Sequence, residues 1–198
     1  MFECLCSGVV GDGMLIDQEE LIMIDFSSIE GVEAALDEEL TSVKAAMSKY
    51  IEVFNNNPQD IEAQLSELRR FRSTSYESLN QSQHEWLLIK GLKWLSSTRN
   101  ISLEARNEYI IQWNPRQTGF SDEPDLRIIN KSIGLEINCE ASTSEKPVGI
   151  IDRRIREHLQ CLSKLNGIKY YFVLTEQMKQ RAETKIRNNG WDIEVIRL

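Results

Sequence analysis

Residues 124–140 read PDLRIINKSIGLEINCE, and this stretch decides how the second half of the chain is expected to fold. Two runs in it, 125–130 and 134–140, are rich in β-branched residues, and the turn-prone pair Lys131-Ser132 separates them. β-Branched residues favour strands, and two such runs around a short polar turn are typical of a β-hairpin. The sequence therefore predicts an antiparallel hairpin with a two-residue loop.

The register of this hairpin determines which polar side chains meet. With a two-residue loop, Asp125 pairs opposite Asn138 and Arg127 pairs opposite Glu136. Because paired residues share a face and side chains alternate along a strand, Glu136, Asn138 and Glu140 project on one side. The apolar residues of both strands project on the other side, toward the core. A four-residue loop preserves this alternation, whereas a three-residue loop reverses it.

The length and composition of the chain limit its class. Its 198 residues support one domain, or one domain with a sizeable extension. No apolar run approaches the ~20 residues that cross a membrane, and the acidic N-terminus does not resemble a secretory signal. The four cysteines do not suggest a disulfide framework, so we expect a reduced, cytoplasmic protein without a membrane partner.

The net charge of −8 is distributed unevenly. Residues 1–80 carry 16 acidic and 5 basic side chains, a net of −11, whereas residues 81–198 carry 15 acidic and 18 basic side chains, a net of +3. A local basic patch, and not the total charge, decides contact with a phosphate backbone. The charge therefore does not exclude nucleic acid as a partner of the second part.

The first part, residues 1–80, is predicted to be mainly helical. After one or two short strands within 1–26, apolar residues recur at steps of three and four from Ile29 to Phe54, close to a heptad pattern. This face has two interpretations, a helix packed on its own neighbour or a homodimer contact, and one sequence does not separate them. A second helix follows Pro58, and the Ser-, Thr- and Asn-rich stretch 73–82 is interpreted as a linker.

The second part, residues 81–198, has a regular order of predicted elements. It begins with a helix (83–97), a strand (101–113), a loop (114–123) and the hairpin. A helix (148–164), a strand (169–175), a helix (176–188) and a final strand (192–197) follow. The pattern predicts an α/β domain in which helices flank a mixed sheet.

This order and the Pro124-Asp125 to Glu136-Ile137-Asn138 spacing resemble the PD-(D/E)XK nuclease superfamily. The resemblance covers about residues 83–198 and implies the restriction-endonuclease-like core, α-β-β-β-α-β, here with an N-terminal mainly helical extension. The chain departs from the pattern at one position, because Asn138 stands where the superfamily expects lysine.

The resemblance implies a metal-dependent active site. Asp125 and Glu136 would bind Mg²⁺ or Mn²⁺ with the main-chain carbonyl of Ile137, and Asn138 would orient water or phosphate. Glu85, on the preceding helix, would assist, although a carboxylate in the first turn of a helix is favourable in any protein. Neither Lys93 nor Lys146 is a convincing substitute for the missing lysine, and His84 is interpreted as an ordinary helix residue.

Candidate contacts to DNA lie mainly on the helix after the hairpin. They comprise three arginines and a glutamine of that helix and one arginine of the loop before Pro124: Arg153, Arg154, Arg156, Gln160 and Arg116. Arginines position phosphates without reading the base sequence, although such residues are also common on solvated helix faces.

Taken together, the resemblance implies a Mg²⁺-dependent DNA endonuclease that acts in restriction, defence or DNA processing. A homodimer formed through the N-terminal helices is a hypothesis. Two alternatives remain open. One is a nuclease-fold binding or assembly module without catalysis, which both the absent lysine and the strongly acidic N-terminal part favour. The other is an RNase or a structure-specific repair nuclease with the same metal site.

Overall fold

The computed structural model describes residues 24–56, 60–99, 101, 108–114 and 123–198. They form an α/β protein in which N-terminal helices precede most of a six-stranded mixed sheet with flanking helices. The elements in chain order are β1 (Ile24–Phe26), α1 (Ile29–Asn56), α2 (Ile61–Thr98), β2 (Ile110–Trp113), β3 (Leu126–Asn130), β4 (Leu135–Ser142), α3 (Ile150–Lys164), β5 (Ile168–Val173), α4 (Glu176–Asn189) and β6 (Glu194–Arg197).

The sheet has the same strand order as the chain, β1 to β6. The first four strands form an antiparallel meander, and β5 and β6 add in parallel to β4. The parallel connections pass through α3 and α4, because a parallel pair requires a crossover between its strands. Helices therefore cover the parallel half of the sheet, whereas a turn suffices between β3 and β4.

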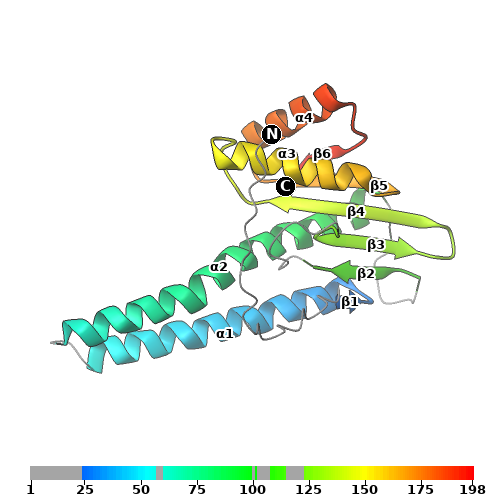
Figure 1. Ribbon diagram of the computed structural model, residues 1–198. Coiled ribbons are helices and arrows are strands. Elements are labelled where there is room, and N and C mark those ends of the chain that lie inside the picture. The colour runs from blue at the N-terminus through cyan, green and yellow to red at the C-terminus, as the bar shows by residue number, and fades with distance from the viewer. Residues whose placement is uncertain (1–23, 57–59, 100, 102–107, 115–122) are drawn as a thin grey trace, which may run out of the picture.

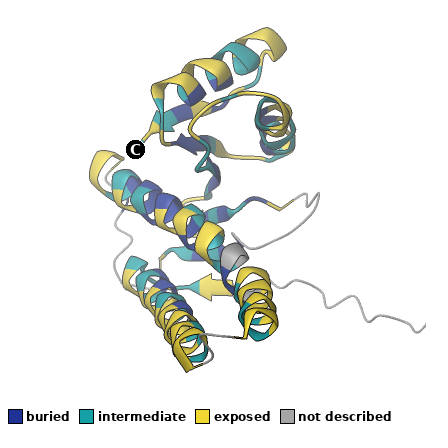
Figure 2. Cartoon of the chain, turned by 90° about the vertical axis from the view of Figure 1, so that its left-hand side faces the viewer, coloured by how far each residue is buried: buried dark blue, intermediate teal, exposed yellow. Residues whose placement is uncertain are grey.

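Two helical layers enclose the sheet, as Figures 1 and 2 show. On one face, α2 and part of α1 pack against the apolar side chains of β2 to β5, among them Leu126, Ile137 and Cys139. On the other face, α3 and α4 pack against Tyr171 and Val195 through their buried residues. Both sides of β5 are therefore buried, as its continuous apolar sequence predicts.

The long helix α2 corrects the predicted organisation of the first half. Residues 73–82, interpreted as a linker, lie inside this helix of 38 residues, and the predicted boundary at residue 80 falls in its middle. The serines are accommodated because their hydroxyls donate to carbonyls one turn back, as Ser73 does to Arg70 and Ser82 to Ser78. Asp60 caps the helix start by accepting from the amide of Ala63, 2.9 Å away.

The hairpin is confirmed, but its loop is longer than predicted. The last cross-strand pair is Asn130 with Leu135, so the turn contains the four residues 131–134 and not two. The side-chain oxygen of Asn130 accepts hydrogen bonds from the backbone amides of Ser132 and Ile133, and Gly134 adopts a φ of 67°. Within the region of the predicted strand 101–113, a described strand covers Ile110–Trp113, and residues 102–107 lie outside the described part.

The later predicted elements are confirmed to within two residues at each end. Of the short strands predicted within 1–26, Ile24–Phe26 is present as β1, and residues 1–23 lie outside the described part. No helix in the described portion of the chain combines the length and apolarity needed to span a bilayer.

Candidate active site

Two carboxylates meet where β3 begins and β4 ends. Leu126 pairs with Cys139, so continuing this register by one position sets Asp125 opposite Glu140. The Oδ2 atom of Asp125 accepts a hydrogen bond from the backbone amide of Ala141 at 3.0 Å, and this bond anchors the aspartate to β4. Both acidic side chains are largely buried, with 15% and 9% of their surfaces exposed. The four-residue turn creates this meeting, because it moves the register by two positions from the predicted one.

A histidine from α2 completes one side of the cluster. The Nε2 atom of His84 lies 3.1 Å from Asp125 Oδ2 and 3.2 Å from the carbonyl oxygen of Ala141. Since an ionised carboxylate and a carbonyl oxygen can only accept, Nε2 carries the hydrogen and donates between them. The carboxylate of Asp125 and the carbonyl of Ala141 therefore converge on one point, which the imidazole N–H occupies.

A histidine from α3 completes the other side. His158 Nδ1 lies 2.7 Å from Glu140 Oε2, and the imidazole is 38% exposed. The chain has two histidines in all, and both contact this pair of carboxylates from helices on opposite faces of the sheet. Four titratable side chains, from α2, the residue before β3, β4 and α3, thus form one cluster.

The charges in this cluster shift one another. Burial and the neighbouring charge of Asp125 raise the pKa of Glu140 to about 7, against the opposing effect of His158. Burial alone would raise the pKa of Asp125, but the imidazole of His84 and the amide of Ala141 hold it below its ordinary value. Burial opposes protonation of His158, yet the hydrogen bond to Glu140 raises the pKa of its imidazole.

These shifts predict a pH-dependent stability in the metal-free protein. Because the pKa of Glu140 is higher in the folded state, the folded protein binds more protons than the unfolded chain between pH 4.5 and about 7, and stability falls as pH rises. The raised pKa of His158 also makes stability fall as pH rises, at pH values above the ordinary pKa of histidine. The lowered pKa of Asp125 affects stability only at acidic pH, below the ordinary pKa of aspartate. We expect up to about 3 kcal/mol of loss across this window in EDTA.

Urea unfolding at several pH values measures this loss, with Glu140→Gln as the matched variant. The variant lacks the carboxyl group and is expected to show a much flatter profile. Equal slopes for the two proteins between pH 4.5 and about 7 would contradict the assignment of the raised pKa to Glu140.

The donor set fits a hard divalent cation. Among the described residues, no group of three or more His, Cys, Asp and Glu side chains is arranged to hold a metal ion. Mg²⁺, however, is commonly bound by one or two carboxylates, with water and substrate oxygens completing its shell. Asp125, Glu140 and the Ala141 carbonyl provide such oxygens, and a cation would relieve the repulsion that raises the pKa of Glu140.

Glu136 and Asn138 lie outside this cluster, which corrects their pairing with Asp125. Asn138 is fully buried and pairs with Arg127 across the hairpin. Its side-chain oxygen accepts a hydrogen bond from Arg127 Nε at 3.0 Å. Its side-chain NH₂ group donates to the carboxylate of Glu136 and to the carbonyl of Asn166. Glu136 is four residues, or about 13 Å along the strand, from Glu140. The network of Asn138 has a structural role, because it ties β4 to the loop before β5.

Other predicted residues also lie apart from the two carboxylates. Ile137 is a core residue opposite Ile128, and the main-chain carbonyl that follows Glu140 belongs to Ala141. Glu85 is buried on α2, directly after His84. Lys93 pairs with Glu33 on α1 at 2.5 Å.

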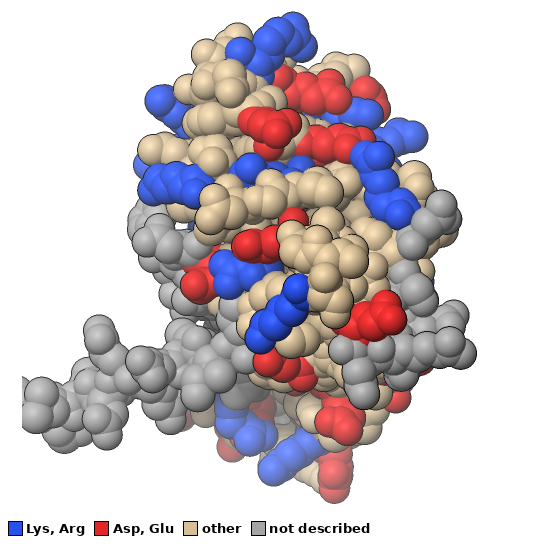
Figure 3. All heavy atoms as spheres, turned by 90° about the vertical axis from the view of Figure 1, so that its right-hand side faces the viewer, with Lys and Arg blue, Asp and Glu red and all other residues tan. Residues whose placement is uncertain are grey.

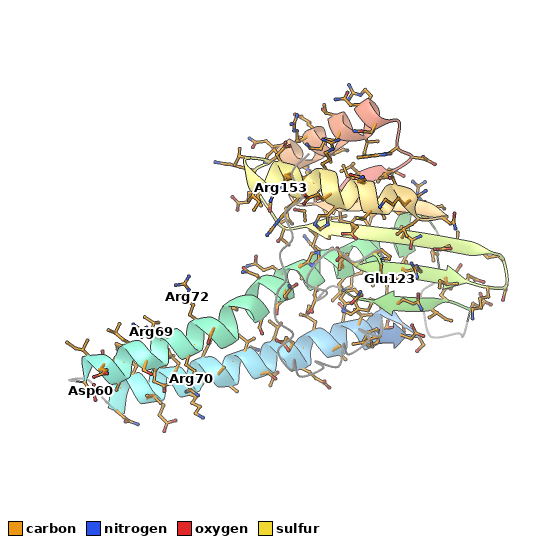
Figure 4. All side chains as sticks on the ribbon, viewed as in Figure 1. Asp60, Arg69, Arg70, Arg72, Glu123 and Arg153 are labelled. Carbon is orange, nitrogen blue, oxygen red and sulfur yellow. The ribbon has the colours of Figure 1, made fainter. Side chains whose placement is uncertain are left out.

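The candidate DNA-contacting residues are exposed on α3, and Arg116 lies outside the described residues. Arg153 is paired with Glu157 at 3.5 Å, and Figure 4 shows it near the start of α3, over the end of β4. Arg154 lies one helical turn before His158 and therefore shares its side of the helix. Figure 3 shows the opposite end of the molecule, where acidic and basic side chains are interspersed.

Sequence reasoning missed the partnership of Glu140 and His158 and underrated His84. Two signals were available. Asn130 and Gly134 suit the ends of a four-residue turn, which pairs Asp125 with Glu140. The scarcity of histidine was the second signal, since a chain with two histidines offers few other imidazoles for acid–base or ligand chemistry.

Comparison of the chain with protein-family models, with curated proteins and with solved structures finds no match in any of the three.

Proposed function

We propose that this protein is a metal-dependent nuclease that hydrolyses phosphodiester bonds in DNA. The observation that supports it most directly is the convergence of Asp125, Glu140 and the carbonyl of Ala141 at the end of β4. Such a set of oxygens, next to the 38% exposed imidazole of His158, suits a Mg²⁺ ion shared with a phosphate. The mildly basic second part of the chain is compatible with a polyanionic substrate.

The corrected site agrees with the PD-(D/E)XK pattern in a different register. Pro124-Asp125 provides the first acid, and Glu140-Ala141-Ser142 provides the second acid with its following positions. The element order from α2 through β5 also resembles the restriction-endonuclease-like core, which we propose as the specific fold. Ser142 now stands at the lysine position, so no cationic side chain enters the site there.

The chemistry follows from these groups. Water adds to phosphorus and a P–O ester bond breaks, so that one product retains the phosphate and the other gains a hydroxyl group. Asp125, Glu140 and the Ala141 carbonyl would hold Mg²⁺, which supplies charge neutralisation and activates water when bound. With these oxygens bound to the cation, the N–H of His84, which now bridges Asp125 and the Ala141 carbonyl, would be available to a phosphate oxygen.

His158 acts as a positioning residue for Glu140. Its Nδ1–H holds the carboxylate from the α3 side, in the manner of partners that orient metal ligands. We expect His158→Ala to lower kcat about 10- to 100-fold with little change in the KM for DNA. His158→Asn, whose amide can donate from a similar place, should recover part of the loss. Ser163→Ala on the same helix serves as the control, because the Ser163 hydroxyl bonds a carbonyl of its own helix. A kcat that stays unchanged in His158→Ala would contradict this role.

Arg154 is the α3 arginine best placed to contact the substrate. It is exposed and shares the side of α3 on which His158 reaches the site, whereas Arg153 and Arg156 project in other directions around the helix. A guanidinium there would bind the phosphates next to the scissile bond without reading sequence.

Supercoiled plasmid incubated with the purified protein and Mg²⁺ or Mn²⁺ tests the proposal. We expect conversion to nicked or linear DNA, complete inhibition by EDTA, and loss of activity in Asp125→Asn. Calorimetric titration of Mn²⁺ into the protein provides a second readout that does not require turnover. Failure to cleave DNA or RNA, together with no metal binding that depends on Asp125, would overturn the proposal.

One observation favours a second candidate, a nuclease-fold module that binds without cleaving. The position of the superfamily lysine is occupied by Ser142, and the described contacts bring no lysine to the carboxylates. DNA binding without cleavage in the plasmid experiment would favour this alternative.

A further inference from the structure

The first two helices form an arm with a well-packed seam. α1 and α2 run antiparallel, and their distal halves extend beyond the sheet (Figure 1). Tyr50 stacks on Phe71 with ring centroids 5.0 Å apart, and Val43 is buried between the helices. The packing of α1 on its own neighbour is thus confirmed, and it accounts for one stripe of the heptad-like pattern.

A second apolar stripe runs along one flank of this arm. Helical periodicity places Met47, Ile51 and Phe54 on the side of α1 that carries Leu40. The same periodicity places three residues of α2 on the side that carries Leu79 and Trp86: Ile61, Leu65 and Leu68. Leu40, Leu79 and Trp86 line one groove, so both stripes lie on the same flank of the arm. We call this surface the apolar flank.

The apolar flank is too large for an ordinary solvated surface. Between 38% and 71% of the surface of each of its eight outer residues is exposed: Met47, Ile51, Phe54, Ile61, Leu65, Leu68, Leu79 and Trp86. At roughly 200 Å² per large side chain, these fractions correspond to roughly 700–800 Å². Patches of that size exceed the ~300–600 Å² of a typical monomer and match the ~800 Å² that each partner buries in a stable interface.

The two ends of the apolar flank differ. The distal end presents exposed apolar side chains, including Phe54 and Leu65. The end near the sheet is a groove of about 500 Å³ whose apolar lining includes Leu36, Leu40 and Ile89. Exposed apolar side chains at one end and a groove at the other suit two copies related by a two-fold axis, because each tip can then cover the groove of its partner.

The charges on the flank agree with the same arrangement. Arg72 and Asp37 are exposed and have no ion-pair partner among the described residues, and Figure 4 shows Arg72 projecting from the side of the arm opposite Arg70. At 1.5 Å per residue, Arg72 lies about 16 Å from the tip and Asp37 about 28 Å from it. A two-fold axis about 22 Å from the tip therefore pairs Arg72 of each copy with Asp37 of the other.

We propose that the chain forms an isologous homodimer through the apolar flank, with the two arms antiparallel as a four-helix bundle. The tip of each arm occupies the groove of the other copy, and two Arg72–Asp37 pairs fix the register. The occupant is a second copy because this one surface carries enough apolar area for an interface, exposed apolar side chains opposite a groove, and opposite charges at matching distances from the axis. The dimer stands independently of the proposed nuclease chemistry, since none of its contacts involves Asp125 or Glu140.

Sedimentation velocity of the full chain over protein concentrations of about 1 to 100 µM tests this dimer. We expect the wild-type protein at twice the 22.9 kDa chain mass. Leu65→Glu is expected to raise the dimer dissociation constant at least about 100-fold. Lys49→Glu, on the opposite flank of α1, is the matched control and leaves the dimer intact.

Charge reversal keeps the test decisive if Leu65→Glu fails to fold. Arg72→Asp and Asp37→Arg change exposed residues, and each alone should weaken the dimer, whereas the double variant should restore it. A wild-type chain that stays monomeric at all concentrations would overturn the proposal. So would a dimer that Leu65→Glu and both single charge reversals leave unchanged, since its interface must then lie elsewhere.

Discussion

Glu140→Gln is expected to reduce metal-dependent DNA cleavage at least about 10³-fold, which corresponds to roughly 4 kcal/mol of transition-state stabilisation. The amide preserves the shape of the side chain and removes the charge that a divalent cation requires. Glu140 lies opposite Asp125 at the end of the hairpin, so no nearby described carboxylate on β4 can take its place. Initial rates of plasmid nicking under saturating Mg²⁺ measure the effect.

Glu136→Gln is the matched control, since the same substitution is made four residues earlier on the same face of β4. Glu136 accepts a hydrogen bond from Asn138 at 3.0 Å, and a glutamine oxygen can accept the same bond. We expect the cleavage rate to remain within about threefold of the wild-type rate. The reverse result, an inactive Glu136→Gln variant and an active Glu140→Gln variant, would contradict the site described here. It would favour the hairpin register with a two-residue loop, in which Glu136 and not Glu140 binds the metal.

The comparison of these glutamates shows how far the sequence could determine the site. Residue alternation predicted that Glu136 and Glu140 share a face, because alternation depends only on the strand. The choice between them depended on loop length, which the β-branched runs do not specify. In the structure, Asn130 caps the turn through its side chain and Gly134 takes a positive φ, and these local interactions select four residues.

The histidines illustrate a second limit. The order of helices and strands in the second half could be predicted because the elements are short, periodic and separated by turn residues. Which polar residue on a helix faces the sheet depends on the rotation of the helix about its axis. The apolar stripe of α3 sets this rotation through Ile155 and Leu159, and it places His158 at the edge of the stripe, within reach of Glu140.

The length of α2 illustrates a third limit. Serine and threonine favour caps and turns, and this preference produced the predicted linker at 73–82. Packing of α1 against α2 outweighs the preference, because Phe71 and Ser82 continue the seam through the serine-rich segment. The result is a continuous helix that carries both His84, which contacts Asp125, and the part of the apolar flank that lies on α2.

Gly167→Ala is expected to destabilise the fold by at least about 4 kcal/mol, a large share of the 5–15 kcal/mol typical of a folded domain. Gly167 has a φ of 72° and precedes β5, where an added Cβ would collide with the carbonyl oxygen of Glu136 and lie 2.9 Å from its carbonyl carbon. A left-handed conformation costs alanine about 1–2 kcal/mol. Relief of the collision must also move the chain away from β4 and break the bond from Asn138 to the Asn166 carbonyl.

Gly134→Ala separates the collision from the backbone conformation. Gly134 has a φ of 67°, close to that of Gly167, but no atom lies within 4 Å of an added Cβ there. The free energy of unfolding of this variant should therefore fall only by the conformational cost, about 1–2 kcal/mol. Urea unfolding of both variants in EDTA measures the difference. Equal losses of unfolding free energy in the two variants would mean that Gly167 does not lie against Glu136 as closely as the structure has it. The buried position of Asn138 between β4 and the loop before β5 would then be wrong as well.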